Sequence, residues 1–301
     1  MTVISARRSA ARRKRVDSAD RLLPGWLASG IAAVMGVVIL VPVGYMILLS
    51  LTPNQDVALG SISLAGLEIS NYVDMWTQAP LLSGLLHTFT AAGGAAIASV
   101  IVAVLAAYPL ARFKFRGRQT YLSALIGVQM VPGTTLVLPL FAVLSWVQTT
   151  LSINYLNGFG PIIITYMTFG VPLSTWLLLS YLQTIPTALE DAALVDGCTR
   201  LGALVRVVLP VTRPALVVAF VFSFLVGWND VLFASVFTNT NTQTLAIVIQ
   251  RFANTQDNMS LPLYGELMSA AVVSALPVVL LYLVFQRQLT SGLSAGSVTG
   301  A

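Results

Sequence analysis

The amino-acid sequence predicts an all-α, polytopic membrane protein with six transmembrane helices and both termini in the cytoplasm. Of its 301 residues, 56% are hydrophobic and 9% are charged, whereas soluble domains carry about 25% charged residues. Its apolar runs exceed the ~18 residues needed to cross a bilayer. They are rich in Ala and Leu and lack the ten-residue alternation of a membrane β-barrel. The sequence therefore excludes both a soluble domain and a barrel.

The chain begins with a polar segment, residues 1–25, which holds seven of the sixteen basic residues. We interpret it as a cytoplasmic tail in contact with anionic membrane lipid. A twin-arginine export signal is the alternative for Arg7-Arg8, but the apolar run that follows lacks a small-residue cleavage site. The transmembrane domain then extends over residues 26–287, and residues 288–301 form a C-terminal cytoplasmic tail.

Six apolar runs in this domain predict the transmembrane helices. The second run contains Gly93-Gly94, which favours close helix packing. The third run is interrupted by Pro132-Gly133 and by Pro139, because proline removes a backbone donor from the helix. The approximate bounds of the six runs are 26–51, 85–110, 121–146, 159–181, 214–237 and 264–285.

The basic residues predict the orientation of the chain. Besides the seven in the N-terminal tail, four follow the second run, three follow the fourth run, and Arg287 follows the sixth. With both termini in the cytoplasm, 15 of the 16 Lys and Arg residues lie on the cytoplasmic side, and Arg251 is the exception. This agrees with the positive-inside rule, and the net charge of +5 then needs no nucleic-acid partner.

A polar segment between the fourth and fifth runs, residues 183–213, carries helix-start signals. Pro186 suits a first helical turn, and Thr187 with Glu190 three residues later fits a capping box. Gly197 can adopt the left-handed conformation that ends a helix. A short cytoplasmic helix is therefore expected between these signals.

A second short helix is expected from Thr199 to Val208, ended by Leu209-Pro210. Two short helices joined at a glycine would form a compact, rigid segment that protrudes from the membrane surface. Ala192 and Ala193 on this segment are small enough to let another backbone approach closely. We therefore interpret the segment as a docking site; an ordinary amphipathic loop is the alternative.

The spacing of this segment resembles the EAA loop of permeases of ATP-binding-cassette (ABC) importers. That pattern is Glu-Ala-Ala, three residues, Gly, nine residues, Ile, one residue and Leu-Pro, and here Asp191 replaces Glu and Val207 replaces Ile. The resemblance implies a cytoplasmic coupling-helix loop that plugs into a separate ATPase subunit and transmits its closure to the membrane. The implied coupling residues are Glu190, Asp191, Ala192, Ala193, Asp196, Gly197, Leu209 and Pro210.

Further segments resemble the carbohydrate-uptake branch of these permeases, the maltose and glycerol-phosphate type. They are residues 107–117, 129–133, 228–230 and 286–288. The resemblance implies one half of a permease heterodimer in the bacterial cytoplasmic membrane. Its partners would be a second homologous permease subunit, two cytoplasmic ATPase subunits and an extracytoplasmic sugar-binding protein. The chain itself would bind no cofactor, because ATP and Mg²⁺ would be held by the partner ATPase.

Polar side chains inside the predicted spans mark candidate positions on a translocation pathway, because such groups are costly in hydrocarbon. They are Gln129, Trp228, Asn229 and Asp230. Asn and Asp can bond to hydroxyl groups, and a Trp face can stack on a sugar ring. Bonds between helices or at a subunit interface are the alternative for each. We expect His87 and Glu266 to be structural anchors.

The sequence contains neither a phosphate-binding loop nor a cluster of metal ligands, and it has one histidine and one cysteine, Cys198. These absences point to a transport subunit rather than an enzyme. The expected activity is uptake of a sugar or oligosaccharide by alternating access. An ion-gradient-driven secondary transporter is the alternative from another class, and glycerol phosphate or another polyol is the alternative substrate.

Overall fold

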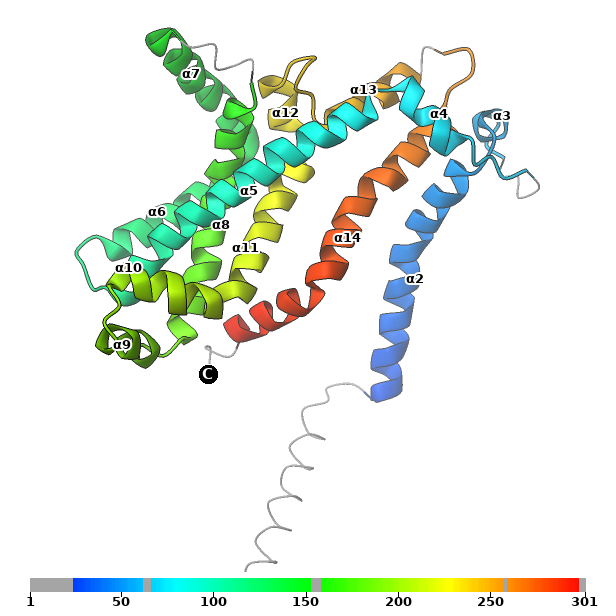
Figure 1. The fold of residues 1–301 in the computed structure, drawn as a ribbon. Coiled ribbons are helices and arrows are strands. Elements are labelled where there is room, and N and C mark those ends of the chain that lie inside the picture. The colour runs from blue at the N-terminus through cyan, green and yellow to red at the C-terminus, as the bar shows by residue number, and fades with distance from the viewer. Residues whose placement is uncertain (1–23, 62–65, 153–157, 257–258, 298–301) are drawn as a thin grey trace, which may run out of the picture.

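The computed structural model describes residues 24–61, 66–152, 158–256 and 259–297 as an assembly of helices (Figure 1). Most of the N-terminal basic tail lies outside the described residues, as do the last four residues of the C-terminal tail. Six helical stretches of the described chain are long and apolar enough to cross a membrane, as predicted. They are Gly25–Ser50, Leu81–Arg112, Gly133–Leu151, Gly160–Thr184, Arg200–Trp228 and Tyr264–Leu289.

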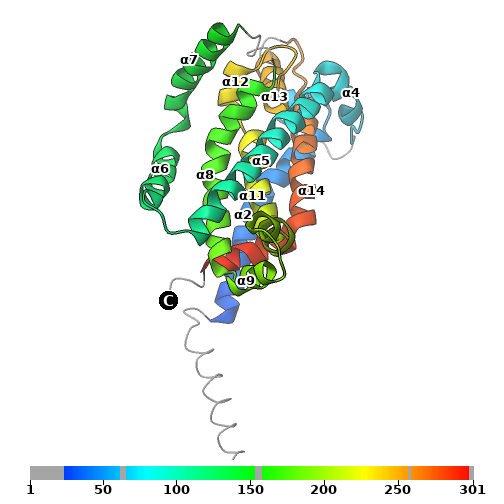
Figure 2. The same ribbon diagram turned by 60° about the vertical axis from the view of Figure 1, so that its left-hand side comes forward.

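The long helices are joined by shorter ones that lie mainly at the two ends of the bundle (Figures 1 and 2). The long helices are α2 (Gly25–Ser50), α5 (Leu81–Arg112), α7 (Gly133–Leu151), α8 (Gly160–Thr184), α11 (Leu209–Trp228) and α14 (Tyr264–Ser297). The shorter ones are α3 (Asn54–Ala58), α4 (Asn71–Gln78), α6 (Arg118–Met130), α9 (Ala188–Val195), α10 (Arg200–Ala203), the π-helical η1 (Leu204–Val208), α12 (Leu232–Phe237) and α13 (Leu245–Thr255).

Helices α5, α8 and α11 form the packed centre of the bundle. Small residues allow this close packing: a Cβ atom at Gly227 would lie 2.7 Å from the Tyr166 ring and 2.8 Å from Ala92. Ala92 and Tyr166 are themselves almost fully buried. In lipid, helices associate through such close contacts because the solvent is as apolar as the side chains.

Helix α2 lies apart from this centre and packs against α14 (Figure 1). Its apolar side chains are largely exposed, and Ser50 at its end is its one buried residue among those described. A polar network holds that end: Asn71 Nδ2 donates to Ser50 O at 3.1 Å, and Ser269 Oγ donates to the same oxygen at 3.2 Å. The exposed surface of α2 is therefore available to lipid or to another subunit.

The bundle has two distinct ends. Figures 1 and 2 place α9 and α10 at one end, together with the α5–α6 connection, the start of α2 and the end of α14. We call this the α9 end. Helices α3, α4, α12 and α13 lie at the opposite end, which we call the α13 end.

The predicted interruption of the third span is confirmed at Val131-Pro132, where the chain leaves α6 and starts α7. Pro139 lies inside α7 without ending it. The predicted end of the second short helix at Leu209-Pro210 is wrong, because the chain stays helical from Arg200 to Trp228. The π-turn of η1 shifts the hydrogen-bond register just before Pro210, so that Leu209 N–H bonds to Leu204 O.

The fifth span also ends earlier than the predicted Phe237, at Trp228. The Asp230 carboxylate provides the reason, since it accepts hydrogen bonds from Phe233 N at 3.2 Å and from Ala234 N at 2.8 Å. These bonds satisfy the first free backbone donors of α12. The chain therefore restarts as a separate short helix after residues 229–231.

The expected anchoring roles of His87 and Glu266 agree with the contacts at the α13 end. His87 Nδ1 lies 3.0 Å from Gln243 O. The buried Glu266 carboxylate accepts a hydrogen bond from Asn54 Nδ2 at 2.8 Å. Both contacts join segments that are far apart in the sequence.

Candidate functional site

Helix α9 follows Pro186 as predicted, but the capping box at its start does not form. Among the described residues, the Thr187 side chain makes no capping bond, although Thr187 precedes the first helical residue. The Glu190 side chain turns toward the bundle and bonds to Arg112 and Tyr108 instead. A charged partner outcompetes a backbone N–H for the carboxylate, because hydrogen bonds between ionised groups are the stronger ones.

The turn after α9 depends on Gly197, which has φ +86°. Cys198 N donates to Ala193 O at 2.9 Å, and Gly197 N donates to Leu194 O at 3.1 Å. This is the bond pattern of a Schellman motif, in which a left-handed residue satisfies the last carbonyls of a helix. The chain then enters α10, where Thr199 Oγ1 accepts a bond from Gly202 N at 3.1 Å. The glycine stop and the helix start at Thr199 are both confirmed.

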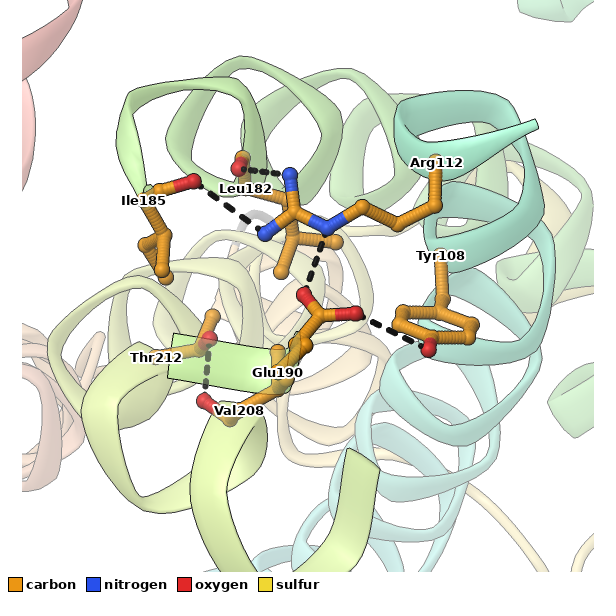
Figure 3. Close-up of polar contacts among 7 residues, drawn as sticks. All are labelled: Tyr108, Arg112, Leu182, Ile185, Glu190, Val208 and Thr212. Atoms are coloured by element: carbon orange, nitrogen blue, oxygen red, sulfur yellow. Dashed lines mark hydrogen bonds and ion pairs between the residues drawn. The ribbon is translucent and has the colours of Figure 1, made fainter. Parts of the chain in front are cut away.

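Arg112, at the end of α5, joins three helices at the α9 end (Figure 3). Its Nε donates to Glu190 Oε1 at 2.5 Å. Its two other nitrogens donate to the carbonyls of Leu182 at 3.0 Å and Ile185 at 3.2 Å, where α8 ends. Tyr108, one turn earlier on α5, donates from its hydroxyl to Glu190 Oε2 at 3.1 Å. The two charged side chains are only 8% and 9% exposed.

Each carboxylate oxygen of Glu190 and each guanidinium nitrogen of Arg112 has a hydrogen-bond partner. The carboxylate takes one donor on each oxygen, and the guanidinium reaches one carboxylate and two carbonyls. A buried ion pair needs such additional bonds, because removing two charges from water is costly. The α8 carbonyls contribute further, since the C-terminal end of a helix favours a cation.

The outer face of α9 presents apolar side chains beside acidic ones. Leu189 is 44% exposed and Val195 is 86% exposed. Asp191, Ala192 and Asp196 are also exposed. On the neighbouring α10 and η1, Leu201 is 70% exposed and Val205 is 59% exposed. We name this surface, made of Leu189, Asp191, Ala192, Val195, Asp196, Gly197, Leu201 and Val205, the α9 face.

The remaining predicted coupling residues lie outside the α9 face. Glu190 is 7% exposed and Ala193 is 6% exposed. Leu209 is half-buried and Pro210 is exposed, and both are part of the continuous helix that leads into the bundle. The predicted set therefore divides into exposed residues on the α9 face, two buried residues on the inner side of α9 (Glu190 and Ala193), and two residues on the helix that leads into the bundle (Leu209 and Pro210).

A second candidate region lies near the α13 end, at a cavity of about 230 Å³ between α11, α13 and α14. Its lining residues are Trp228, Asn229, Leu245, Ala246, Ile249 and Ser274. Trp228 is 7% exposed, and its ring lies against Phe224 and Phe89 with centroids 5.3 Å away in each case. Asn229 is exposed.

The other two predicted pathway residues are not among those that line this cavity. Asp230 is occupied by the α12 backbone and by Tyr166, whose hydroxyl donates to Asp230 Oδ2 at 3.1 Å. Gln129 lies on an exposed face of α6, just before the break at Pro132. The structure therefore brings Trp228 and Asn229 to one cavity and assigns Asp230 a contact role between α8 and α12.

Sequence reasoning missed Arg112 and Tyr108 as members of the site. Their spacing of four residues puts both on one face of α5, which is the only local signal of a shared partner. Nothing nearby in sequence points to Glu190, which lies 78 positions away from Arg112. In the part of the chain that the structure describes, no three His, Cys, Asp or Glu residues are grouped to hold a metal ion.

Six apolar helical spans, with a polar segment of short helices bonded to one end of the bundle, define a polytopic helical membrane protein. The chain belongs to the family of binding-protein-dependent transport system inner membrane components, whose model matches residues 99–294. It is therefore a multi-pass inner-membrane transport subunit of an ABC importer and not an enzyme.

Curated relatives cover most of the chain. The sulfoquinovosyl glycerol transport system permease protein SmoH of Agrobacterium fabrum is 34% identical over 77% of this chain and 78% of its own length. The maltose/maltodextrin transport system permease protein MalG of Escherichia coli is 35% identical over 73% of each chain. A bacterial ABC transporter involved in the import of alginate has the same fold, with a TM-score of 0.71 at 19% identity over 87% of this chain and 95% of that one.

Proposed function

We propose that this permease subunit imports a sugar or oligosaccharide by alternating access, driven by separate ATPase subunits that dock on the α9 face. The observation that carries the proposal is the position of α9. Its outer face is exposed, and its inner face bonds through Glu190 to Arg112 at the end of α5, which in turn bonds to the end of α8. A force applied to α9 is therefore transmitted through Glu190 and Arg112 to α5 and α8. The relatives named for maltodextrin and for sulfoquinovosyl glycerol support a sugar as the cargo.

The α9 end is assigned to the cytoplasm. The α5–α6 connection and the segment from α10 to α11 lie at this end (Figure 1), and they carry seven basic residues in the sequence. Arg251, on α13, belongs to the opposite end. The positive-inside rule favours this orientation, which places both tails, residues 1–25 and 288–301, in the cytoplasm with the transmembrane domain, residues 26–287, between them.

The coupling residues act in two ways. Asp191, Ala192, Asp196 and Gly197 on the α9 face contact the ATPase, whose cleft must offer apolar walls and a basic group to match Asp191 and Asp196. Small side chains at positions 192 and 197 permit close approach. Glu190, Ala193, Leu209 and Pro210 belong to the connection between the α9 face and the bundle. The loop 183–213 thus acts as one mechanical unit.

The cavity at the α13 end is a section of the translocation pathway. Trp228 offers one part of its ring, because Phe224 and Phe89 cover the rest, and Asn229 offers a polar side chain at the same cavity. Asp230 shapes the pathway by capping α12, and Gln129 lies where the α6–α7 break frees backbone groups. A sugar needs this combination of an aromatic face and hydrogen-bonding groups.

The complete transporter contains this chain, a second homologous permease subunit, two ATPase subunits and an extracytoplasmic binding protein. A solved alginate transporter is described in complex with an alginate-bound periplasmic protein, which supports a binding-protein partner for this family. ATP and Mg²⁺ are held by the ATPase subunits, and this chain contributes no cofactor site. The exposed surfaces of α2 and α7 face lipid or the second permease subunit.

The test is purification of the tagged subunit from its native membrane, followed by reconstitution of the complex in liposomes. We expect an ATPase, a second permease and a binding protein to co-purify, and labelled sugars screened against the binding protein to identify the cargo. Uptake must require ATP and must survive an ionophore that collapses ion gradients. Uptake without the ATPase, or its loss with the ionophore alone, would instead establish a secondary transporter.

A polyol or glycerol phosphate cargo is distinguished by adding these compounds to the same screen against the binding protein.

The single cysteine, Cys198, lies in the turn after α9 and is half-buried. Its labelling tests which side of the membrane the α9 end faces. A membrane-impermeant maleimide should label Cys198 in inside-out vesicles and not in intact cells. Labelling from outside would contradict the cytoplasmic assignment of the α9 end.

A further inference from the structure

Helix α9 itself makes few described contacts with the spanning helices. The principal packing neighbours of α9 are α10 and η1, which belong to the same polar segment. Its side-chain bonds to the spanning helices run through Glu190, to Arg112 and Tyr108 of α5. When α9 is displaced, the Glu190 bonds to Arg112 and Tyr108 must therefore either break or pull α5 along with α9.

Arg112 is suited to carry such a displacement because its planar group has donors in fixed directions. One donor holds Glu190 on α9, and the other two hold the carbonyls of Leu182 and Ile185 at the end of α8. The guanidinium is thus the point at which α5, α8 and α9 meet (Figure 3). A lysine has no planar fork, so it cannot hold the carboxylate and both carbonyls in this geometry.

We propose that Arg112, together with Glu190 and Tyr108, is a positioning device that makes α9, α5 and α8 move as one body when the ATPase subunits close. Arg112 and Tyr108 lie at the α9 end and do not line the cavity at the α13 end, and the Glu190 carboxylate is turned toward α5, away from the α9 face. This inference rests on the proposed function, because it concerns how force enters the same subunit. It changes the role of Glu190 from an ATPase contact to a connection within the permease.

The test follows a nucleotide-driven change at the far end of the bundle and therefore needs no knowledge of the cargo. In the complete complex in liposomes, Cys198→Ser removes the native thiol and Asn229→Cys places a new one at the α13-end cavity. ATP with vanadate is expected to change the rate at which an impermeant maleimide labels this thiol. The rates of ATP hydrolysis and the amount of bound ATPase are measured on the same samples.

In this background, Arg112→Lys is expected to keep ATPase association and hydrolysis within about twofold, while the nucleotide-dependent change in labelling falls by about tenfold, within the range typical of coupling between distant sites. Tyr108→Phe removes one hydroxyl and should give a smaller loss of the same response. Arg116→Lys, at an exposed position on the α5–α6 connection, is the matched control and should keep the full response. Glu190→Gln provides a second test if Arg112→Lys does not assemble.

An unchanged labelling response in Arg112→Lys and in Glu190→Gln would overturn the inference. So would a loss of ATPase association in step with the response, because that pattern belongs to a folding or docking role. If the parent complex itself binds no ATPase or shows no nucleotide-dependent labelling, the proposed function fails instead. The two failures are therefore distinct.

Discussion

Tyr166 on α8 donates its hydroxyl to Asp230 Oδ2 at 3.1 Å, while the same carboxylate accepts two backbone N–H groups of α12. The Tyr166 bond joins residues 64 positions apart, and the two backbone bonds lie where the fifth span stops. Asp230 was predicted to lie on the translocation pathway, but its described hydrogen bonds are to Tyr166 and to the backbone of α12. This contact leads to the first of four predictions.

Asp230→Ala should lower the stability of the subunit by about 1–2 kcal/mol, because two backbone donors of α12 lose their acceptor. Asp230→Asn keeps one oxygen acceptor and should cost less than Asp230→Ala. Tyr166→Phe should cost about 1 kcal/mol, the usual value of one hydrogen bond. The apparent melting temperature of the detergent-purified subunit, read by size-exclusion chromatography after heating, measures all three. An Asp230→Ala protein as stable as the parent would show that these bonds contribute nothing.

Gly227→Ala should be strongly destabilising, by about 1–3 kcal/mol. The new methyl group would lie 2.7 Å from the Tyr166 ring and 2.8 Å from Ala92, and both neighbours are almost fully buried. Gly93→Ala is the matched control, since no described atom beyond its own stretch of helix lies within 4 Å of its new Cβ. The same melting measurement should separate the two variants. Equal melting temperatures would mean that α5, α8 and α11 are less closely packed than the structure shows.

Gly197→Ala should destabilise the turn after α9 by about 1 kcal/mol, because the strain comes from the left-handed backbone and not from crowding. Gly197→Asn should cost less, since asparagine tolerates that conformation. Gly197→Arg adds a long side chain to the α9 face. It should abolish both transport and ATPase capture while the subunit still inserts in the membrane.

Capture of the ATPase on the tagged subunit measures the docking effect of Gly197→Arg, and the yield of membrane-inserted protein is the control. Normal capture by the arginine variant would remove the α9 face as the docking surface. The alanine and asparagine variants separate this effect from strain in the turn, because they occupy the same left-handed position with much smaller side chains than arginine.

Ala246→Trp should reduce uptake at least fivefold by filling the cavity at the α13 end, where Ala246 is one of the lining residues. ATPase association should be unchanged, because the α9 face is at the opposite end of the bundle (Figure 1). Ile97→Trp, at a position on α5 that is 56% exposed, controls for the added bulk. Uptake at the parental rate in Ala246→Trp would exclude this cavity from the pathway.

The sequence by itself determined the features that depend on local chemistry. Runs of apolar residues identified six membrane spans, the proline at position 132 marked the break between α6 and α7, and Gly197 marked the end of α9. Each of these signals acts within a few residues of the position that it specifies, because hydropathy, a missing N–H and a left-handed φ are local properties. The spacing of the EAA-like segment, which also identified the family, is local in the same sense.

Only the tertiary structure decided which partner each polar side chain takes. Glu190 had a local partner available in the backbone at Thr187, yet it bonds to Arg112, which the fold brings to it from 78 positions away. Asp230 similarly bonds to Tyr166, and the π-turn of η1 carries the helix through Pro210. The physical reason is that a charged group in a poorly hydrated bundle takes the strongest donor within reach. Helix packing sets which donor is within reach, and this information cannot be read from the order of residues along the chain.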